Sequence, residues 1–207
     1  VKTGGLGDVL GALPKALARR GHNVVTAIPR YESITGHKLA PSSWEGQVSV
    51  AGASHHLSHA THVCRKSGLQ TWLIENTAMF TRPGIYQDPA TGKDFSDNDI
   101  RFHFFAKAAL ECCRRNGFKP DILHLHDWQA ALTALFVKTI YKHDPLFAKA
   151  GIVLTIHNLA FQGRFPAERF RLLELPESLF TPTAPLEFYG TVNFLKGAIM
   201  SADRITT

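Results

Sequence analysis

The sequence predicts an α/β fold in which a parallel β-sheet carries helices on both faces. Short β-branched runs alternate along the chain with stretches whose apolar residues recur at helical spacing. Such alternation produces crossover connections between parallel strands, and these place helices on either side of the sheet. The composition agrees, because 207 residues with 44% hydrophobic content can enclose a core, and 19% charge is too low for a disordered segment. We therefore expect one globular domain over residues 1–207.

The first half of the chain begins with a glycine-rich turn and a helix. Apolar residues recur at helical spacing from Asp8, and Gly21 stands where that helix should end. Residues 23–28 form a β-branched run closed by Pro29, which predicts a buried strand. The other elements predicted in this half are a hairpin inserted within residues 31–68, a strand at 70–75 and a long exposed loop at 81–96.

The second half continues the alternation of helices and strands. Asp97 is placed to cap a helix that extends to Arg115 and ends at Gly117. The following predicted elements are a strand at 121–126, a helix at 129–141, a strand at 152–157, short helical pieces at 166–173 and 176–180, a helix at 192–200 and the start of a strand near 204. Only Val1 precedes the first motif, and residues 201–207 stop at the start of a strand. We therefore expect a fragment cut at both ends, without its first strand.

Charge and cysteine content exclude several classes of protein. The net charge is +6, but the basic residues are scattered in short pairs without interleaved aromatic residues, so we expect no nucleic-acid partner. Three cysteines without metal-ligand spacing indicate a reducing, cytoplasmic chain. No apolar run approaches membrane-spanning length, so no membrane association is expected.

Three polar segments follow predicted strands or precede a predicted helix. They are residues 2–8, 124–128 and 157–160. In open parallel sheets ligands bind beyond the carboxyl ends of the strands, because the β-to-α turns emerge there. The sequence therefore predicts that these three segments gather along one edge of the sheet.

The first of these segments has the chemistry of a phosphate site. Its glycines allow close approach of the backbone, the helix that follows directs its positive end toward an anion, and Lys2 adds an ammonium group. A tight strand-to-helix turn without a ligand is the alternative. The spacing does not match a dinucleotide fingerprint, since Gly11 falls one position late, and the Gly-Lys-Ser/Thr ending of a P-loop is missing.

The other two segments are rich in histidine. His124 and His126 are two residues apart on a strand and face the same way, as in some metal-binding pairs, with Asp127 as a further candidate ligand. Hydrogen bonding to the backbone or to a polar substrate is the alternative that we favour. His157 and Asn158 offer an imidazole and an amide suited to sugar hydroxyls, or a histidine packed beneath a loop.

Five ordered segments together resemble the amino-terminal half of bacterial glycogen synthases and plant starch synthases. The segments are KTGGLGDVLGALPKAL, RPGIYQDPATGKDFSDNDIRFHFFAKAALE, PDILHLHDWQAAL, TIHNLAFQG and EFYGTVNFLKGAIMSADRITT. They span nearly the whole chain, apart from residues 31–68. The resemblance implies the Rossmann-like, acceptor-side N-terminal lobe of a GT-B glycosyltransferase, with the C-terminal lobe absent.

The resemblance also implies a reaction and its site. Glucose would pass from ADP-glucose to the non-reducing end of an α-1,4-glucan with retention of the anomeric configuration, without a metal or other cofactor. The implied catalytic residues are His157 and Asp127, near the transferred glucose. The implied substrate-binding residues are Lys2, Gly4, Gly5 and Asp8 for the phosphates and their loop, Asn158 beside the histidine, and Tyr86 on a loop that borders the cleft. Asp97, Asn98 and Arg101 are read as a helix-cap and scaffold network.

Other functions stay open beside this one. Another GT-B transferase with a different nucleotide or acceptor shares much of the pattern. A catalytically silent module that binds glucan or nucleotide is a second alternative, and a metal-dependent hydrolase built on His124, His126 and Asp127 is a third. A plastid location replaces the cytoplasm if the chain is a plant starch synthase.

Overall fold

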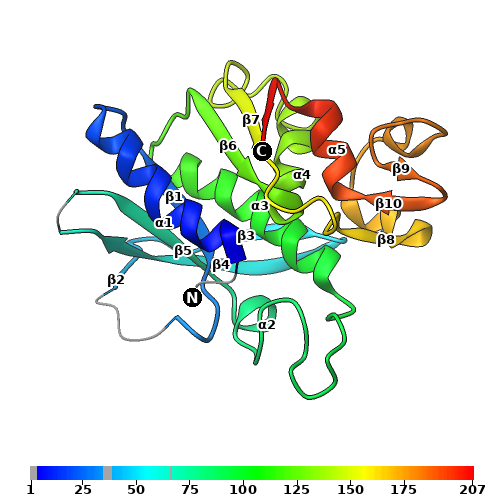
Figure 1. Ribbon diagram of the computed structural model, residues 1–207, viewed down its shortest axis with the longest axis horizontal. Coiled ribbons are helices and arrows are strands. Elements are labelled where there is room, and N and C mark those ends of the chain that lie inside the picture. Colours follow the sequence, from blue (N-terminus) through cyan, green and yellow to red (C-terminus); the bar gives the residue numbers. More distant parts are fainter. Residues whose placement is uncertain (1–3, 35–38, 66) are drawn as a thin grey trace. The chain divides into compact units, whose positions relative to one another are not determined.

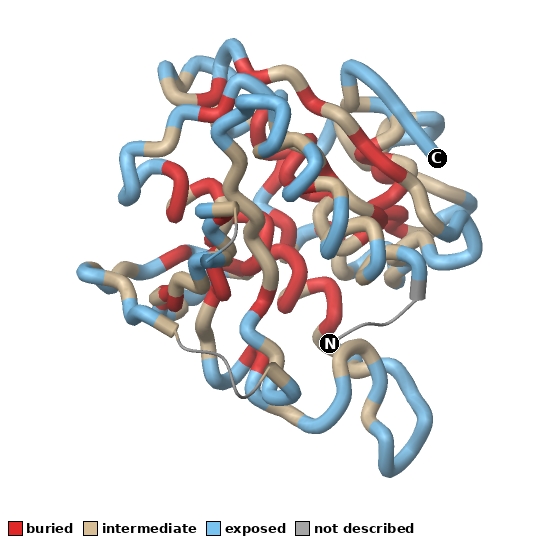
Figure 2. Tube along the Cα trace, turned by 60° about the vertical axis from the view of Figure 1, so that its left-hand side comes forward, coloured by how far each residue is buried: buried red, intermediate tan, exposed pale blue. Residues whose placement is uncertain are grey.

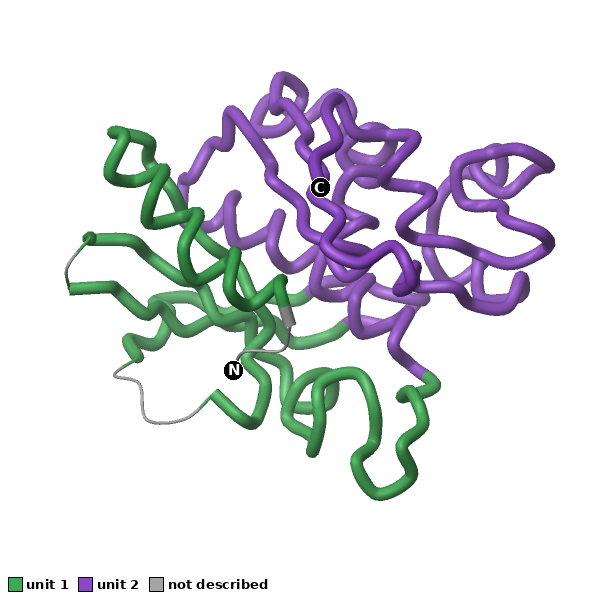
Figure 3. The backbone as a smooth tube through the Cα atoms, in the orientation of Figure 1, with its two compact units in different colours: residues 1–47, 55–96 green, residues 48–54, 97–207 purple. Residues whose placement is uncertain are grey.

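The computed structural model describes residues 4–34, 39–65 and 67–207 (Figure 1). These residues form two compact units, coloured separately in Figure 3. Unit 1 comprises residues 1–47 and 55–96, and unit 2 comprises residues 48–54 and 97–207. Each unit is described by itself.

Unit 1 is built on a mixed sheet with the strand order β1-β5-β4-β2, in which β3 also pairs with β4. Strands β1 and β5 are parallel, while β4 and β5 are antiparallel. The predicted inserted hairpin is confirmed, because β3 and β4 form it within residues 31–68. The elements are α1 (Gly4–Arg19), β1 (Val25–Pro29), β2 (Ala40–Pro41), β3 (Gly46–Val50), β4 (Ala53–Val63), β5 (Gln70–Glu75) and α2 (Thr77–Phe80). Residues 48–54, at the end of β3 and the start of β4, are assigned to unit 2.

The glycine-rich turn that was predicted to precede the first helix is part of that helix. Helix α1 begins at Gly4, so Gly5 and Gly7 belong to its first turns and not to a turn that precedes it. Leu6 continues the apolar spacing of the helix toward the N-terminus, and the first N–H groups of a helix need no intrahelical acceptor. The glycines are therefore accommodated at the helix end where backbone hydrogen bonding matters least.

Unit 2 contains a parallel sheet with the order β11-β7-β6 and an antiparallel sheet with the order β8-β10-β9. The core of this unit draws on α3, α4 and α5 and includes the fully buried Phe102, Phe104, Leu135 and Phe194. Figure 2 shows buried residues in red. The elements are α3 (Asn98–Arg115), β6 (Ile122–His126), α4 (Asp127–Lys138), β7 (Gly151–Thr155), β8 (Arg164–Pro166), η1 (Ala167–Leu173), η2 (Glu177–Phe180), β9 (Glu187–Phe188), β10 (Thr191–Asn193), α5 (Phe194–Ser201) and β11 (Arg204–Thr206).

Several predicted boundaries in unit 2 move by a few residues. Helix α4 starts at Asp127, two residues early, and β7 ends at Thr155, before His157. The two short helical pieces are 3₁₀ helices, and the helix predicted from residue 192 begins at Phe194 because Thr191–Asn193 pair as strand β10. The predicted parallel strands are present but fall in two sheets, and the inserted hairpin gives β5 an antiparallel partner in the first of them.

Helix α3 is held by buried polar contacts. The buried Arg101 donates from Nη1 to Asn98 Oδ1 at 2.6 Å, as the predicted scaffold network requires. Asp97 occupies the N-cap position, but within this fully described helix its side chain makes no capping hydrogen bond. The fully buried Asp99 accepts two hydrogen bonds from Arg169, at 2.6 and 2.7 Å. Such a bidentate pair ties η1 to the start of α3.

Among the described residues, no helix is both long and apolar enough to cross a lipid bilayer.

Candidate functional site

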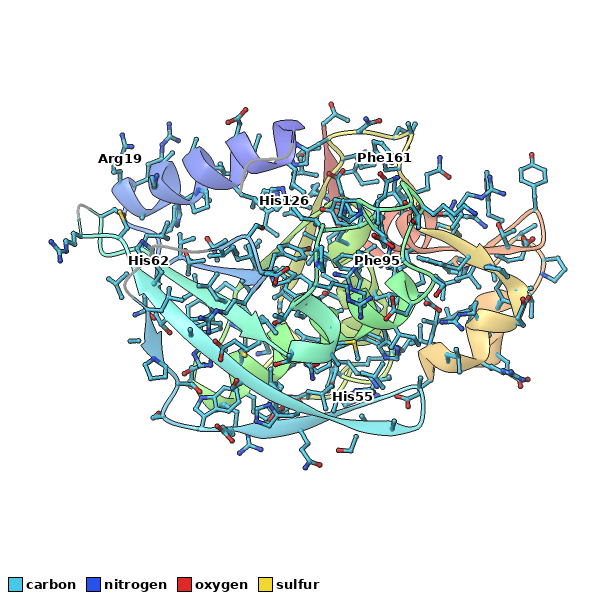
Figure 4. The ribbon with its side chains drawn as sticks, turned by 90° about the horizontal axis from the view of Figure 1, so that it is seen from below. Arg19, His55, His62, Phe95, His126 and Phe161 are labelled. Carbon is cyan, nitrogen blue, oxygen red and sulfur yellow. The ribbon has the colours of Figure 1, made fainter. Side chains whose placement is uncertain are left out.

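The carboxyl ends of β6 and β7 bring three histidines together. The parallel register places His126 opposite Thr155, the last residue of β7, and His157 follows two positions later. The rings of His124 and His126 stack with centroids 4.4 Å apart, and those of His126 and His157 stack at 5.3 Å. We call His124, His126 and His157 the histidine stack; Figure 4 labels its central member.

Hydrogen bonds connect the histidine stack across the sheet. His126 Nδ1 lies 3.0 Å from His157 Nε2, so one of these two nitrogens carries the shared proton. His124 Nε2 lies 2.6 Å from the Thr155 hydroxyl, which in turn is 2.6 Å from the Thr206 hydroxyl. The chain of contacts therefore runs from β6 through β7 to β11, and rotation of any one ring breaks a hydrogen bond.

The environment keeps two of these imidazoles neutral. Burial is the main cause that lowers the pKa of His126 to about 3, and the neighbouring His124 and His157 lower it further. Burial, followed by the proximity of His157, also lowers the pKa of His124. Neutral rings can stack closely without charge repulsion, and each offers one donor and one acceptor nitrogen. The site is therefore suited to hydrogen bonding with a polar ligand at neutral pH.

Asp127 ties the two strand ends to each other. It is the first residue of α4, its φ is +56°, and only 7% of the residue is exposed. Its carboxylate accepts a hydrogen bond from the backbone N–H of His157 at 2.8 Å, through Oδ1. A left-handed backbone costs free energy at a non-glycine residue, and such conformations gather at functional sites. The structure thus joins two of the predicted catalytic residues that are 30 positions apart.

The loop after β7 is fixed at several points. Asn158 Oδ1 accepts the backbone N–H of Ala160 at 2.9 Å, and Gln162 Oε1 accepts from Asn193 Nδ2 at 2.7 Å. Gly163 has φ +62°, and a Cβ placed there would lie 2.5 Å from the Trp128 ring. The glycine therefore allows the loop to pass directly over Trp128. Phe161 in the same loop is 64% exposed and is labelled in Figure 4.

The remaining predicted site residues belong to unit 1 or lie outside the described residues. Lys2 is among residues 1–3, which the structure does not describe. Gly4, Gly5 and Asp8 lie in the first turns of α1, and Asp8 is exposed. Tyr86 lies in the loop over residues 81–96, where its carbonyl oxygen accepts the N–H of Phe95 at 3.0 Å. The predicted gathering of three segments is thus confirmed within unit 2 for two of them.

The predicted alternative of a metal centre finds no support in the described residues, which contain no group of three or more His, Cys, Asp or Glu side chains placed to hold an ion. Hydrogen bonds already engage one ring nitrogen of each histidine: Nδ1 of His126 with Nε2 of His157, and Nε2 of His124 with the Thr155 hydroxyl. Sequence reasoning overlooked Thr155 and Thr206 as partners of the stack. Their only signal is a hydroxyl residue at the last position of β7 and of β11.

Comparison with known proteins agrees with this arrangement. Residues 1–207 match the family described as the starch synthase catalytic domain. Glycogen synthase 2 of Geobacter metallireducens is 42% identical over 207 residues, and the glycogen synthase of Koribacter versatilis is 42% identical over 208 residues. In both cases the alignment covers 100% of this chain and 42% of the relative. The chain therefore spans less than half the length of the curated relatives that it matches.

A solved structure gives the same result. The catalytic domain of starch synthase IV from Arabidopsis thaliana, bound to ADP and acarbose, superposes with a TM-score of 0.86 at 30% identity. The superposition covers 100% of this chain and 42% of that chain. The predicted fold class, an α/β Rossmann-like part of a GT-B glycosyltransferase, is confirmed by this match. Since the family match extends over all 207 residues, the chain belongs to the starch synthase catalytic domain family.

Proposed function

We propose that the protein to which this chain belongs transfers glucose from ADP-glucose to the non-reducing end of an α-1,4-glucan, with retention of configuration. The family assignment and the glycogen synthases at about 40% identity support this activity. The Arabidopsis neighbour was solved with ADP and acarbose, which supports a nucleotide and a glucan-like ligand. A cytoplasmic location belongs to the same proposal, supported by Cys112 and Cys113, whose thiols form no disulfide.

The observation that carries the proposal is the contact between Asp127 and His157 at the ends of two parallel strands. The buried carboxylate holds the backbone N–H of His157 at 2.8 Å, while His126 holds its ring at 3.0 Å. Both the main chain and the imidazole of His157 are therefore fixed before any ligand arrives. Preorganised polar groups stabilise a transition state without the cost of rearranging during the reaction.

Glucosyl transfer needs such groups at two places. An oxocarbenium-like sugar must be stabilised, and the departing diphosphate must be neutralised. In the proposal, His157 and Asn158 hydrogen-bond the transferred glucose, and Asp127 lies near the donor sugar and the acceptor. Lys2 contacts the phosphates, and Gly4 and Gly5 give the diphosphate and the glucose access to the backbone at the start of α1, where the helix dipole favours an anion. Asp8 orients this segment or contacts the ligand. Tyr86 lies on a loop that borders the active cleft.

The test uses the full-length enzyme with radiolabelled ADP-glucose and glycogen. We expect incorporation of label into glycogen, a lower rate with UDP-glucose, and a drop in kcat/KM for ADP-glucose in the Lys2→Ala variant. Unchanged catalytic efficiency in that variant would contradict the role of Lys2. Faster transfer from UDP-glucose would support the alternative of another GT-B donor specificity.

A second test addresses the 207-residue polypeptide by itself. Because it spans 42% of its relatives, we expect it to elongate no glucan, although it retains the histidine stack. Radiolabel incorporated into glycogen by this purified polypeptide would refute the expectation. Retention on glycogen without turnover would instead agree with the alternative of a silent binding module.

A further inference from the structure

The two ring nitrogens of His157 have different surroundings. Nε2 lies 3.0 Å from Nδ1 of His126, within hydrogen-bonding distance. Nδ1 makes no hydrogen bond with any residue that the structure describes. His157 is half-buried and follows the last residue of β7 by two positions, at the edge where parallel sheets bind their ligands. Nδ1 is therefore the nitrogen of His157 that remains for a ligand.

The contact between the two rings couples their tautomers. A neutral imidazole carries one N–H group and one bare nitrogen. In a pair of neutral rings, if Nδ1 of His126 donates, then Nε2 of His157 is bare and Nδ1 of His157 carries the hydrogen. If Nε2 of His157 donates instead, its Nδ1 becomes an acceptor. The state of the His126 nitrogen thus decides whether His157 offers a donor or an acceptor to a ligand.

His126, labelled in Figure 4, is itself held in place by several contacts. It ends β6, where it pairs with Thr155 of β7. Its ring stacks on that of His124 with an interplanar angle of 26°, and on that of His157 at 17°. His124 is fixed in turn by the Thr155 hydroxyl at 2.6 Å. His126 therefore has a defined ring orientation before any ligand arrives.

The main chain of His157 is fixed by contacts that leave its ring free to turn. Asp127 accepts the backbone N–H of His157 at 2.8 Å, and the preceding Ile156 donates its N–H to the Thr206 carbonyl oxygen at 3.0 Å. The torsion that turns a histidine ring about its Cβ–Cγ bond is broad and roughly two-fold. A flipped ring would place carbon where Nε2 now lies and break the contact with His126. Of the contacts that the described residues make, this one therefore selects the ring orientation.

We infer that His126 is a positioning residue for glucosyl transfer, which holds His157 in one ring orientation and one tautomer and so presents Nδ1 of His157 to the sugar hydroxyls. The inference rests on the proposed function, in which His157 hydrogen-bonds the transferred glucose. In this role His126 touches no substrate and acts only through His157. A hydrogen-bonding group stabilises a transition state most when its orientation is set in advance.

Two variants of the full-length enzyme separate the hydrogen bond of His126 from the stacking of its ring. His126→Phe keeps an aromatic ring but has no nitrogen, whereas His126→Asn lacks the ring but keeps a hydrogen-bonding amide close to the position of Nδ1. We expect kcat for ADP-glucose to fall by about 10² in His126→Phe, because one preorganised hydrogen-bonding group is lost from its orientation. His126→Asn should recover at least about tenfold of that loss. Lower activity in His126→Asn than in His126→Phe would overturn the inference.

A double-mutant cycle tests whether His126 acts through His157. His126→Phe combined with His157→Ala should lower kcat by no more than about twofold beyond His157→Ala alone, because no imidazole remains to be positioned. A purely structural role of His126 would lower kcat to the same extent in both backgrounds. Equal falls in the two backgrounds would therefore contradict a positioning role.

Nuclear magnetic resonance of ¹⁵N-labelled histidine in the full-length enzyme gives a readout that needs no activity. The signals of His157 are identified by their loss in His157→Ala, and they distinguish a protonated from a bare ring nitrogen. We expect a single tautomer of His157 in the wild type and a mixture in His126→Phe. A mixture already present in the wild type would overturn the inference without reference to any variant.

The outcomes separate this inference from the proposed function. If the full-length enzyme transfers no glucose while the His157 signals still depend on residue 126, the proposed function is wrong and the positioning stands. If transfer proceeds and His126→Phe changes neither kcat nor the His157 signals, the positioning is wrong and the proposed function stands.

Discussion

The carboxyl end of β5 in unit 1 and the carboxyl ends of β6 and β7 in unit 2 use polar residues in different ways. At the end of β5, Glu75 pairs with Arg30 and accepts the Ser58 hydroxyl at 2.8 Å. The next residue, Asn76, caps α2 through the N–H of Met79. Each polar group there neutralises a neighbour or ends a helix, as expected of scaffold.

At the ends of β6 and β7 the polar groups of His126 and Asp127 are fixed by hydrogen bonds rather than by an ion pair such as Glu75–Arg30. Burial keeps the His126 ring uncharged, and Asp127 accepts the main-chain N–H of His157. Asp127 also adopts a backbone conformation that costs free energy. The comparison shows that a polar residue at the carboxyl end of a strand does not by itself identify a functional site. The two strand ends differ in the left-handed backbone of Asp127 and in the burial that lowers the pKa of His126.

The largest expected effect comes from removing the ring of His157 in the full-length enzyme. His157→Ala should lower kcat for ADP-glucose by about 10³, because loss of one preorganised hydrogen-bonding group at a transition state costs about 10²–10³. Steady-state kinetics with glycogen as acceptor measures this. Far-UV circular dichroism of the variant shows whether the fold is retained. A drop below tenfold would remove the functional distinction between the two strand ends.

The next effect concerns the loop after β7. Gly163→Ala should lower the free energy of unfolding by about 3 kcal/mol, because it combines a left-handed alanine with overlap against the buried Trp128 ring. Urea denaturation followed by tryptophan fluorescence measures the loss.

Gly92→Ala is the matched control for that variant. Gly92 has φ +68°, and no atom lies within 4 Å of the position that an added methyl group would take, so this variant measures backbone strain alone, about 1–2 kcal/mol. Equal losses of unfolding free energy in the two variants would mean that the Trp128 ring moves aside at little cost. The loop would then be less rigidly positioned than the contacts indicate.

A third effect follows from the neutral state of His126. Its folded-state pKa of about 3 lies below the ordinary value of 6.5, so the unfolded chain takes up a proton first as pH falls. The stability that the neutral His126 contributes is therefore fully present above about pH 6.5 and is lost progressively between pH 6.5 and 3. At pH 4.5 the titration of His126 should lower the free energy of unfolding by about 2–3 kcal/mol.

Urea denaturation at pH 7 and pH 4.5 tests this dependence. His126→Gln lacks the titrating group, so its loss of stability between the two pH values should be smaller than that of the wild type. Identical losses would show that the histidine stack accepts a proton readily, and that its environment resembles the scaffold after all.

The smallest effect is expected at the end of β5. Glu75→Gln should change the free energy of unfolding by less than about 1 kcal/mol, because its ion pair with Arg30 is partly exposed to solvent. The kcat of the full-length enzyme should change by less than about threefold, a difference that the same kinetic assay detects. A drop comparable to that of His157→Ala would place Glu75 in the site.

Much of the site was predictable because it depends on short-range patterns. The spacing of His124 and His126 on one strand face, and the position of His157 after the next strand, follow from strand periodicity and from the rule that parallel strands end at one edge. The stacking distances, the hydrogen bond from His157 to Asp127 and the partnership with Thr155 and Thr206 depend on register and rotamers, which one sequence does not reveal.

The amino-acid sequence by itself determined the α/β alternation, the order of the elements and the family, because these arise from local periodicity and from motifs read in order. Tertiary structure alone decided that α1 begins at Gly4, that the parallel strands divide between two sheets and that Tyr189 stands exposed on a strained turn. The division of the strands depends on pairing between residues far apart in the chain. Local propensity contributes only about 1 kcal/mol at a position, so packing and strand pairing override it.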